Sequence, residues 1–237
     1  MRRLVPVIFM LTLLVSSCYK DDTILYSHTF MADYSAGCLH ADNGLIYNIV
    51  ERECDVIPDT LKRVYVLCDI LRESPRGKDE YEIRLRDFVR VLVKDVVPSS
   101  SPEEYCRAGS DPISLLLAWP SGPYLNTRVA FTVQEVSKTV HRINLSLDEE
   151  RSTRDTLFFE LRHDASGEFY GSPSISSASS LKSASAFASF PVRHLIPEGQ
   201  QEIGVDISWH WHAANPDGTL RRETQYNHVT GSLKRQN

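Results

Sequence analysis

Apolar and polar residues alternate along several stretches of this chain, and that period of two constrains its fold more than any other feature. The stretches are Val64-Val66-Cys68-Ile70, Tyr81-Ile83-Leu85, Thr127-Val129-Phe131-Val133 and Ile203-Val205-Ile207-Trp209-Trp211. Alternate side chains of a β-strand point to opposite faces, so each stretch presents one face to a core. Turn-forming segments such as Asp42-Asn43-Gly44 separate the stretches, and no long amphipathic helix is evident. The sequence therefore predicts an all-β protein.

A run of Pro and Ser at 98–102 interrupts this pattern and indicates a linker. About five strands are expected before it, at 24–37, 44–51, 61–72, 79–86 and 88–96. The alternation changes phase around Asp87 and Phe88, as a β-bulge or a sharp bend requires. Five short strands suit a small OB-like barrel, and six or seven strands after the linker suit an antiparallel β-sandwich. We expect a barrel domain at 24–97, a linker at 98–110 and a sandwich domain at 111–237.

The N-terminus has the organisation of a lipoprotein signal peptide. Arg2 and Arg3 precede an apolar stretch, 4–15, that is too short to span a bilayer, and Cys18 follows two serines. This is the pattern of a bacterial lipobox, so we expect a signal peptide at 1–17 and acylation of Cys18. The acyl chains would hold the protein in outer-membrane lipid. The alternative is an ordinary signal peptide in which the cysteine occurs by chance.

Charged residues follow this cysteine within four positions. Lys20, Asp21 and Asp22 resemble the surface-export signal of Bacteroidota lipoproteins. We therefore expect residues 18–23 to form a lipidated tether and the protein to be anchored in the outer membrane, facing the cell surface. The alternative interpretation is a solvated polar tether without an export function.

Four other cysteines are available for pairing, because a lipoprotein of this kind lies in an oxidising compartment. Cys68 shares its phase with buried positions and is expected in the core as a thiol. Cys38 and Cys54 flank a short predicted hairpin and are the expected disulfide pair.

Charge and composition bear on the partners. The net charge of −5 shows no basic excess, so we expect no nucleic acid. The predicted barrel carries five tyrosines that could stack on sugar rings or fill the core: Tyr26, Tyr34, Tyr47, Tyr65 and Tyr81. The ligands left open are a glycan and a protein.

Two patterns suggest chemistry. His210 and His212 lie at i and i+2 of a predicted strand and form a weak candidate metal half-site, whose alternative is a solvated outer face. His163 and Asp164 lie near many serines, which could suggest a serine hydrolase. The sequence contains no G-x-S-x-G motif that would present a nucleophilic serine, however. The sequence predicts no catalytic residue, no bound metal and no cofactor.

Short segments at 81–96, 111–113, 124–131 and 160–168 together resemble the NigD-like lipoproteins of Bacteroidota, named from a bacteriocin operon. The chain departs from that pattern in its Ser-rich segment 172–185. The resemblance implies a lipobox, an OB-like domain and a C-terminal β-sandwich, and no catalytic residue. We expect a non-enzymatic binding or assembly module. The alternatives are a bacteriocin-operon accessory protein, acting in export or immunity, and a metal-dependent or serine hydrolase.

Overall fold

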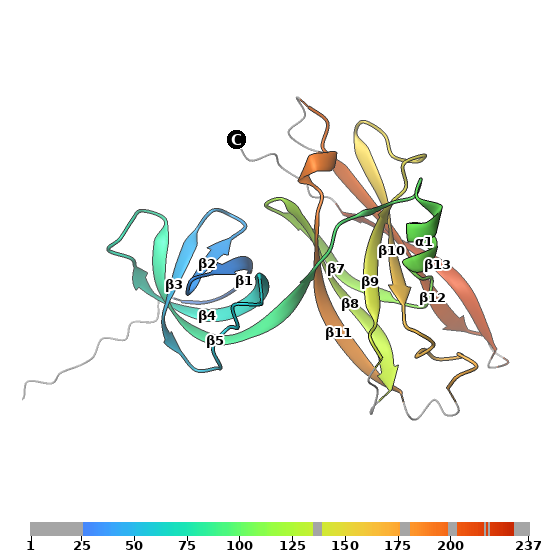
Figure 1. Ribbon diagram of the computed structural model, residues 1–237, viewed down its shortest axis with the longest axis horizontal. Coiled ribbons are helices and arrows are strands. Elements are labelled where there is room, and N and C mark those ends of the chain that lie inside the picture. The colour runs from blue at the N-terminus through green and yellow to red at the C-terminus, as the bar shows by residue number, and fades with distance from the viewer. Residues whose placement is uncertain are drawn as a thin grey trace, which may run out of the picture.

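The computed structural model describes residues 26–134, 139–175, 181–198, 203–215, 217 and 219–229 (Figure 1). Apart from one short α-helix and one 3-10 turn, all its regular elements are strands, which confirms the predicted all-β fold. The first group is β1 (Tyr26–Ser35), β2 (Cys38–Ala41), β3 (Ile46–Arg52), β4 (Arg63–Glu73), β5 (Glu80–Val93) and β6 (Val97–Pro98). The helix α1 (Pro102–Arg107) separates it from β7 (Ser114–Ser121), β8 (Tyr124–Gln134), β9 (Arg142–Leu147), β10 (Thr156–Asp164), β11 (Leu181–Pro191), a 3-10 turn (Arg193–Leu195), β12 (Gly204–Ala214) and β13 (Leu220–Val229).

Strands β1 to β5 form the expected OB-like barrel. Their order is β3-β2-β1-β4-β5, and a further pairing of β3 with β5 closes the sheet on itself. The alternating residues Val64, Val66, Cys68 and Ile70 are all completely buried inside it. The predicted strands 79–86 and 88–96 are one continuous strand, β5. Arg86 bulges out of it between the pairs Leu67–Asp87 and Cys68–Leu85. The bulge accounts for the change of phase in the sequence.

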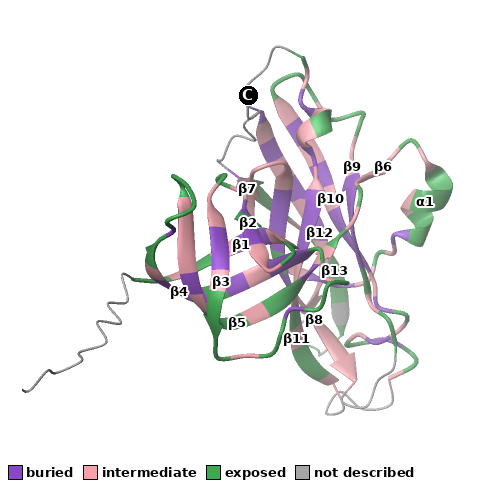
Figure 2. Cartoon of the chain, turned by 60° about the vertical axis from the view of Figure 1, so that its left-hand side comes forward, coloured by how far each residue is buried: buried purple, intermediate pink, exposed green. Residues whose placement is uncertain are grey.

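The second half of the chain forms a β-sandwich. Strands β11, β8 and β7 continue the barrel sheet, and they face a five-stranded sheet of order β13-β12-β10-β9-β6. The core between the two sheets includes Leu125, Val129, Phe159, Ile207 and Trp209. Figure 2 shows the buried positions recurring along these strands, as the period of two requires. A single eight-stranded sheet therefore forms the barrel at one end and one layer of the sandwich at the other.

The sequence predicts an antiparallel sandwich, but some of its strand pairs are parallel. Strand β10 pairs in parallel with β12, β5 pairs in parallel with β11, and β6 pairs in parallel with β9. Each of these pairings joins segments that are far apart in the sequence. The alternation pattern gives the face of each strand but not its neighbour, so it could not reveal these pairings.

The helix α1 lies within the expected linker. Pro102 occupies its first turn with Glu103 and Glu104, and Arg107 lies in its last turn. Gly109 follows with φ +82°, the left-handed conformation that commonly ends a helix. No residue of α1 is buried, and Figure 2 shows it on the outside of the sandwich. No helix among the described residues is long and apolar enough to span a membrane.

Candidate functional site

The helix α1 is held on the outer face of the five-stranded sheet by a cluster of polar side chains. The Tyr105 hydroxyl donates a 2.5 Å hydrogen bond to Glu160 Oε2, and Arg162 donates to Glu160 Oε1 over 2.9 Å. The guanidinium carbon of Arg162 lies 3.8 Å from the centre of the Tyr105 ring. Because the Glu160 carboxylate accepts a hydrogen bond on each oxygen, it holds Tyr105 of α1 and Arg162 of β10 in fixed positions, and so fixes the helix.

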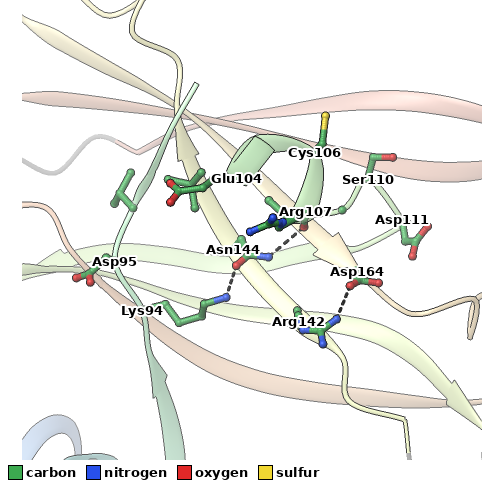
Figure 3. Close-up of a pocket in the computed structure, with 14 residues that line it drawn as sticks. Lys94, Asp95, Glu104, Cys106, Arg107, Ser110, Asp111, Arg142, Asn144 and Asp164 are labelled. Carbon is green, nitrogen blue, oxygen red and sulfur yellow. Dashed lines mark hydrogen bonds and ion pairs between the residues drawn. The ribbon is translucent and has the colours of Figure 1, made fainter. Parts of the chain in front are cut away.

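A groove of about 1110 Å³ lies between α1, the segment that follows β5, and strands β9 and β10 (Figure 3). Its lining is rich in charged side chains: Lys94, Asp95, Glu104, Arg107, Asp111, Arg142 and Asp164. Among the described residues that line it, none is aromatic. Because this groove is open and its lining is polar and held by fixed contacts, we take it as the candidate site.

Lys94 is the partly buried cation of the groove. Its ammonium group donates to Asn144 Oδ1, and Asn144 Nδ2 donates in turn to the carbonyl of Ala108 over 3.0 Å. Burial lowers the pKa of Lys94, and the nearby charge of Arg142 lowers it further. Asn144 is itself 5% exposed, so the lysine is held by a fixed amide.

Arg142 extends the positive charge along β9. It forms an ion pair of 2.8 Å with Asp164 at the end of β10. Burial acts to raise the pKa of Asp164, but hydrogen bonds from the Ser166 amide and from Arg142 outweigh it and hold that pKa below its usual range. Figure 3 shows Lys94 reaching across the groove toward Asn144 and Arg142.

The segment 109–111 forms the wall of the groove next to β10. The Asp111 amide donates to the His163 carbonyl over 2.8 Å, and the Asp111 carboxylate accepts from the Ala165 amide. A Cβ atom at Gly109 would lie 2.3 Å from the His163 carbonyl oxygen. The backbone therefore approaches the strand as closely as only glycine permits.

A buried chain of hydrogen bonds supports this wall from behind. His163 Nδ1 contacts the Pro112 carbonyl at 2.9 Å and donates to it, because a carbonyl oxygen only accepts. In the neutral imidazole, which burial favours, Nε2 then accepts from His141 Nδ1 at 3.1 Å. His141 Nε2 then faces Glu168 Oε2 at 3.3 Å. Burial lowers the pKa of His163.

This arrangement bears on the hydrolase alternative. His163 is 1% exposed, and within the described residues its side-chain hydrogen bonds go to Pro112 and His141 rather than to a hydroxyl or a thiol. Asp164 points into the groove and pairs with Arg142. The adjacent His163 and Asp164 therefore take separate structural roles, and the described contacts assemble no nucleophile and base.

His210 and His212, the candidate metal half-site, lie on one face of β12 as the strand pattern predicts, but both contact protein side chains. Trp209 is 7% exposed and His210 lies on the opposite face of β12, where its Nε2 pairs with Glu160 Oε1 at 3.1 Å. His212 packs edge-on against the Phe169 ring. Among the described residues no group of three His, Cys, Asp or Glu could hold a metal ion. His210 instead belongs to the cluster that fixes α1.

The predicted Cys38–Cys54 disulfide is wrong. All four cysteines among the described residues are free, and the Cys38 thiol donates to Asn48 Oδ1. The hairpin register pairs Cys38 with Asn48, six positions before Cys54. Strand β3 continues past this pair to Arg52, so it carries the chain away from Cys38 before Cys54 is reached. Cys68 is fully buried, as expected.

The five tyrosines do not gather in one groove. Tyr47 is 1% exposed, and it stacks on Phe30 and Tyr81. Burial raises the pKa of Tyr47 to about 12. Tyr65 lies elsewhere and stacks on Phe187 of the sandwich. The described contacts therefore show that Tyr47, Tyr65 and Tyr81 pack against other rings, whereas Tyr26 is 52% exposed.

The remaining predicted residues, Cys18, Lys20, Asp21 and Asp22, lie outside the described residues. Sequence reasoning missed Lys94, Arg142 and Asn144, because they come from separate strands with no motif between them. One signal was available: Ser101-Pro102-Glu103-Glu104 is a helix start, and Gly109 is a helix end, so α1 beside the groove could have been found.

Comparison with known proteins places the site within a recognised domain. Residues 95–218, just over half of the chain, match the family described as NigD-like C-terminal beta sandwich domain. This range includes every residue of the groove except Lys94. No curated protein matches the chain.

Three solved structures share the fold. A protein of unknown function from Bacteroides vulgatus is 23% identical, with a TM-score of 0.57, and the match covers 87% of this chain and 93% of that one. A NigD-like immunity protein from Bacteroides caccae is 17% identical, with a TM-score of 0.55 and coverage of 84% and 91%. A protein named as a candidate lipoprotein from Bacteroides fragilis is 12% identical, with a TM-score of 0.56 and coverage of 87% and 99%.

Proposed function

Because the chain belongs to the family with a NigD-like C-terminal β-sandwich domain, we propose that it is a non-enzymatic accessory lipoprotein of the outer membrane. In this proposal Cys18 carries the lipid, Lys20, Asp21 and Asp22 direct the protein to the cell surface, and the groove beside α1 binds a partner protein.

The observation that carries the binding role is the charged groove itself. Its walls are fixed by glycine packing at Gly109, by the Asn144 amide and by the ion pair of Arg142 with Asp164. Fixed charges and amides in an open groove bind polar ligands without a large ordering cost. The described side chains of this groove pair with one another and not in the manner of a nucleophile and its base, which supports binding rather than catalysis.

A polypeptide fits this groove better than a neutral glycan does. Sugar rings are commonly bound by stacking on aromatic side chains, and the described lining has none. Charged side chains of both signs and the Asn144 amide suit a peptide, which carries charges and amides of its own. The composition of the groove therefore supports a protein rather than a glycan as the ligand in this proposal.

Crosslinking on intact cells tests the binding role. A photo-reactive amino acid at Arg107, which lies on the rim of the groove, is compared with one at the exposed Val50 of the barrel. We expect the Arg107 position to form a discrete adduct with one protein and the Val50 position to form none. Equal adducts from both positions, or none from Arg107, would reject the groove as a binding site.

The anchor and its orientation have separate tests. Replacing Cys18 with Ala removes the acylated thiol and should release the protein from membranes. Full retention of the variant on membranes would refute the lipid anchor. Replacing Lys20, Asp21 and Asp22 with Ala should lower the labelling of intact cells, and unchanged labelling would refute the export signal.

A second candidate function is an immunity or export role beside a bacteriocin. It is favoured by the similar fold of the Bacteroides caccae protein named as a NigD-like immunity protein. This role predicts small toxin genes next to the gene for this chain. A neighbourhood without them would remove this candidate and leave the general binding role in place.

A further inference from the structure

Two cations of the groove lie close together although they come from distant parts of the chain. Lys94 follows the last residue of β5, and Arg142 begins β9. Asn144 accepts the Lys94 ammonium on the strand that carries Arg142, and the charge of Arg142 acts on Lys94. Like charges repel at short range, so a fold that holds them together in one groove favours an anion between them.

The charges of the described residues do not neutralise Lys94. Arg142 has the Asp164 carboxylate as its partner at 2.8 Å. Lys94, in contrast, has no carboxylate within ion-pair distance among the described residues, and its described side-chain partner is the neutral Asn144. An ammonium has three donors, and only one of them is used by Asn144. Donors of Lys94 therefore remain available to a ligand.

Four acidic residues line the groove: Asp95, Glu104, Asp111 and Asp164. Asp164 is paired with Arg142, whereas Asp95 and Asp111 are placed away from Lys94. The Asp111 carboxylate accepts the Ala165 amide on the opposite side of the groove. Asp95 is exposed, and Figure 3 shows it pointing away from Asn144 and Arg142. Lys94, Arg142 and Asp164 together therefore carry one net positive charge, although four acidic and three basic residues line the groove as a whole.

We propose that Lys94 and Arg142 bind a carboxylate of an acidic peptide segment in this groove. The inference rests on the proposed binding function and names the chemistry of the ligand. Arg142 keeps donors beyond the one that it gives to Asp164, so both cations can contact the same carboxylate. Charge-assisted hydrogen bonds of this kind are the strong ones in protein recognition.

Binding of short synthetic peptides to the mature chain with Cys18→Ala tests the proposal. The probes are an acetylated and amidated peptide of alternating Glu and Ser, the same peptide with Gln in place of Glu, and an oligogalacturonate as an acidic glycan. We expect the Glu peptide to bind about tenfold more tightly than the Gln peptide by calorimetry. Nuclear magnetic resonance should show the pKa of Lys94 rising when the Glu peptide binds.

Three variants complete the test. Lys94→Met should weaken binding of the Glu peptide about tenfold, whereas Lys94→Arg should keep most of it. Lys62→Met, at an exposed lysine of the barrel, is the matched control and should have no effect. Thermal unfolding of each variant shows that it is folded.

Equal affinity for the Glu and Gln peptides would overturn the proposal, as would an unchanged affinity of Lys94→Met. Binding of the oligogalacturonate without binding of the Glu peptide would overturn the choice of a peptide. If the Arg107 crosslink forms on cells while these peptide tests fail, the binding function stands and only the carboxylate chemistry is wrong. If the crosslink also fails, the proposed function fails with it.

Discussion

The Arg63 guanidinium of the barrel donates a 2.8 Å hydrogen bond to the hydroxyl of Ser189 in the sandwich, 126 positions later in the sequence. Arg63 also pairs with Asp42 at 2.6 Å and with Asp33 at 2.9 Å. Its guanidinium carbon lies 3.8 Å from the centre of the Tyr124 ring. The arginine has no exposed side-chain surface, so one buried cation joins the two halves of the molecule.

Replacing Arg63 with Met should therefore destabilise the fold strongly. The change leaves Asp42, whose side chain is only 5% exposed, as a buried carboxylate without this partner. Breaking a buried ion pair by removing one member costs about 3–5 kcal/mol. Urea unfolding measures the loss. Arg107→Met, which removes an exposed pair with Glu103, is the control and should cost less than about 1 kcal/mol. Similar losses in both variants would refute the role of Arg63.

Gly109→Ala should be much more harmful than Gly37→Ala. Both glycines have φ +82°, so the left-handed backbone conformation of an alanine lowers the free energy of unfolding by about 1 kcal/mol at either position. Only Gly109 has neighbours, because its added Cβ would meet the His163 carbonyl oxygen at 2.3 Å, whereas nothing lies within 4 Å of Gly37. Thermal unfolding should show an additional loss of about 1–3 kcal/mol for Gly109→Ala. Equal losses would contradict the close packing of the groove wall.

Stability should fall as the pH drops below about 6.5, through His163. Burial lowers the pKa of this histidine in the folded state, while in the unfolded chain it titrates normally. Between the lowered pKa and 6.5 the unfolded state binds more protons, so acid favours unfolding, and the contribution vanishes above that window. Asp111, Asp164 and His141 are the other charged or titratable groups that act on His163.

Urea unfolding across pH 5 to 8 measures this dependence. His163→Asn can keep the hydrogen bond to Pro112 but cannot titrate, so its stability should depend less steeply on pH. The exposed His40, replaced in the same way, is the control and should leave the slope unchanged. An identical slope for the wild type and His163→Asn would show that His163 does not cause it.

The free thiols give a prediction that needs no mutation. Cys106 is exposed and should react first with iodoacetamide, whereas Cys68 is buried and should react only after unfolding. Burial, with the nearby Asp69, raises the pKa of Cys68 to about 12, which further suppresses its thiolate. Mass spectrometry of peptides from alkylated protein locates the modified residues. A peptide pair that contains a Cys38–Cys54 disulfide would contradict the structure.

The sequence reveals the strands more readily than their arrangement. The alternation of Val64, Val66 and Ile70 identifies a core face correctly, because that property depends on local backbone geometry alone. The parallel pairing of β10 with β12 depends on contacts across some 50 residues, which no local pattern encodes. The short β2 (Cys38–Ala41) lies between the predicted strands 24–37 and 44–51, so the pairing of Cys38 with Asn48 was not foreseen.

The candidate site was harder to foresee for the same reason. His210 and His212 do share a face of β12, but the partner of His210 is Glu160 on β10, which is 50 positions earlier in the sequence. Lys94 and Arg142 have nothing in their own neighbourhoods that distinguishes them from solvated surface charges. Only the fold brings them to one groove and removes Lys94 partly from solvent.

The central claim is that the groove beside α1 is the binding surface of an accessory lipoprotein. Hydrogen exchange of the mature protein, measured with and without the Glu peptide, tests it most directly. We predict slower exchange at 94–97, 106–111 and 142–144, with the barrel strand β3 unchanged. Protection confined to the barrel, or no change at the groove under saturating peptide, would contradict the account.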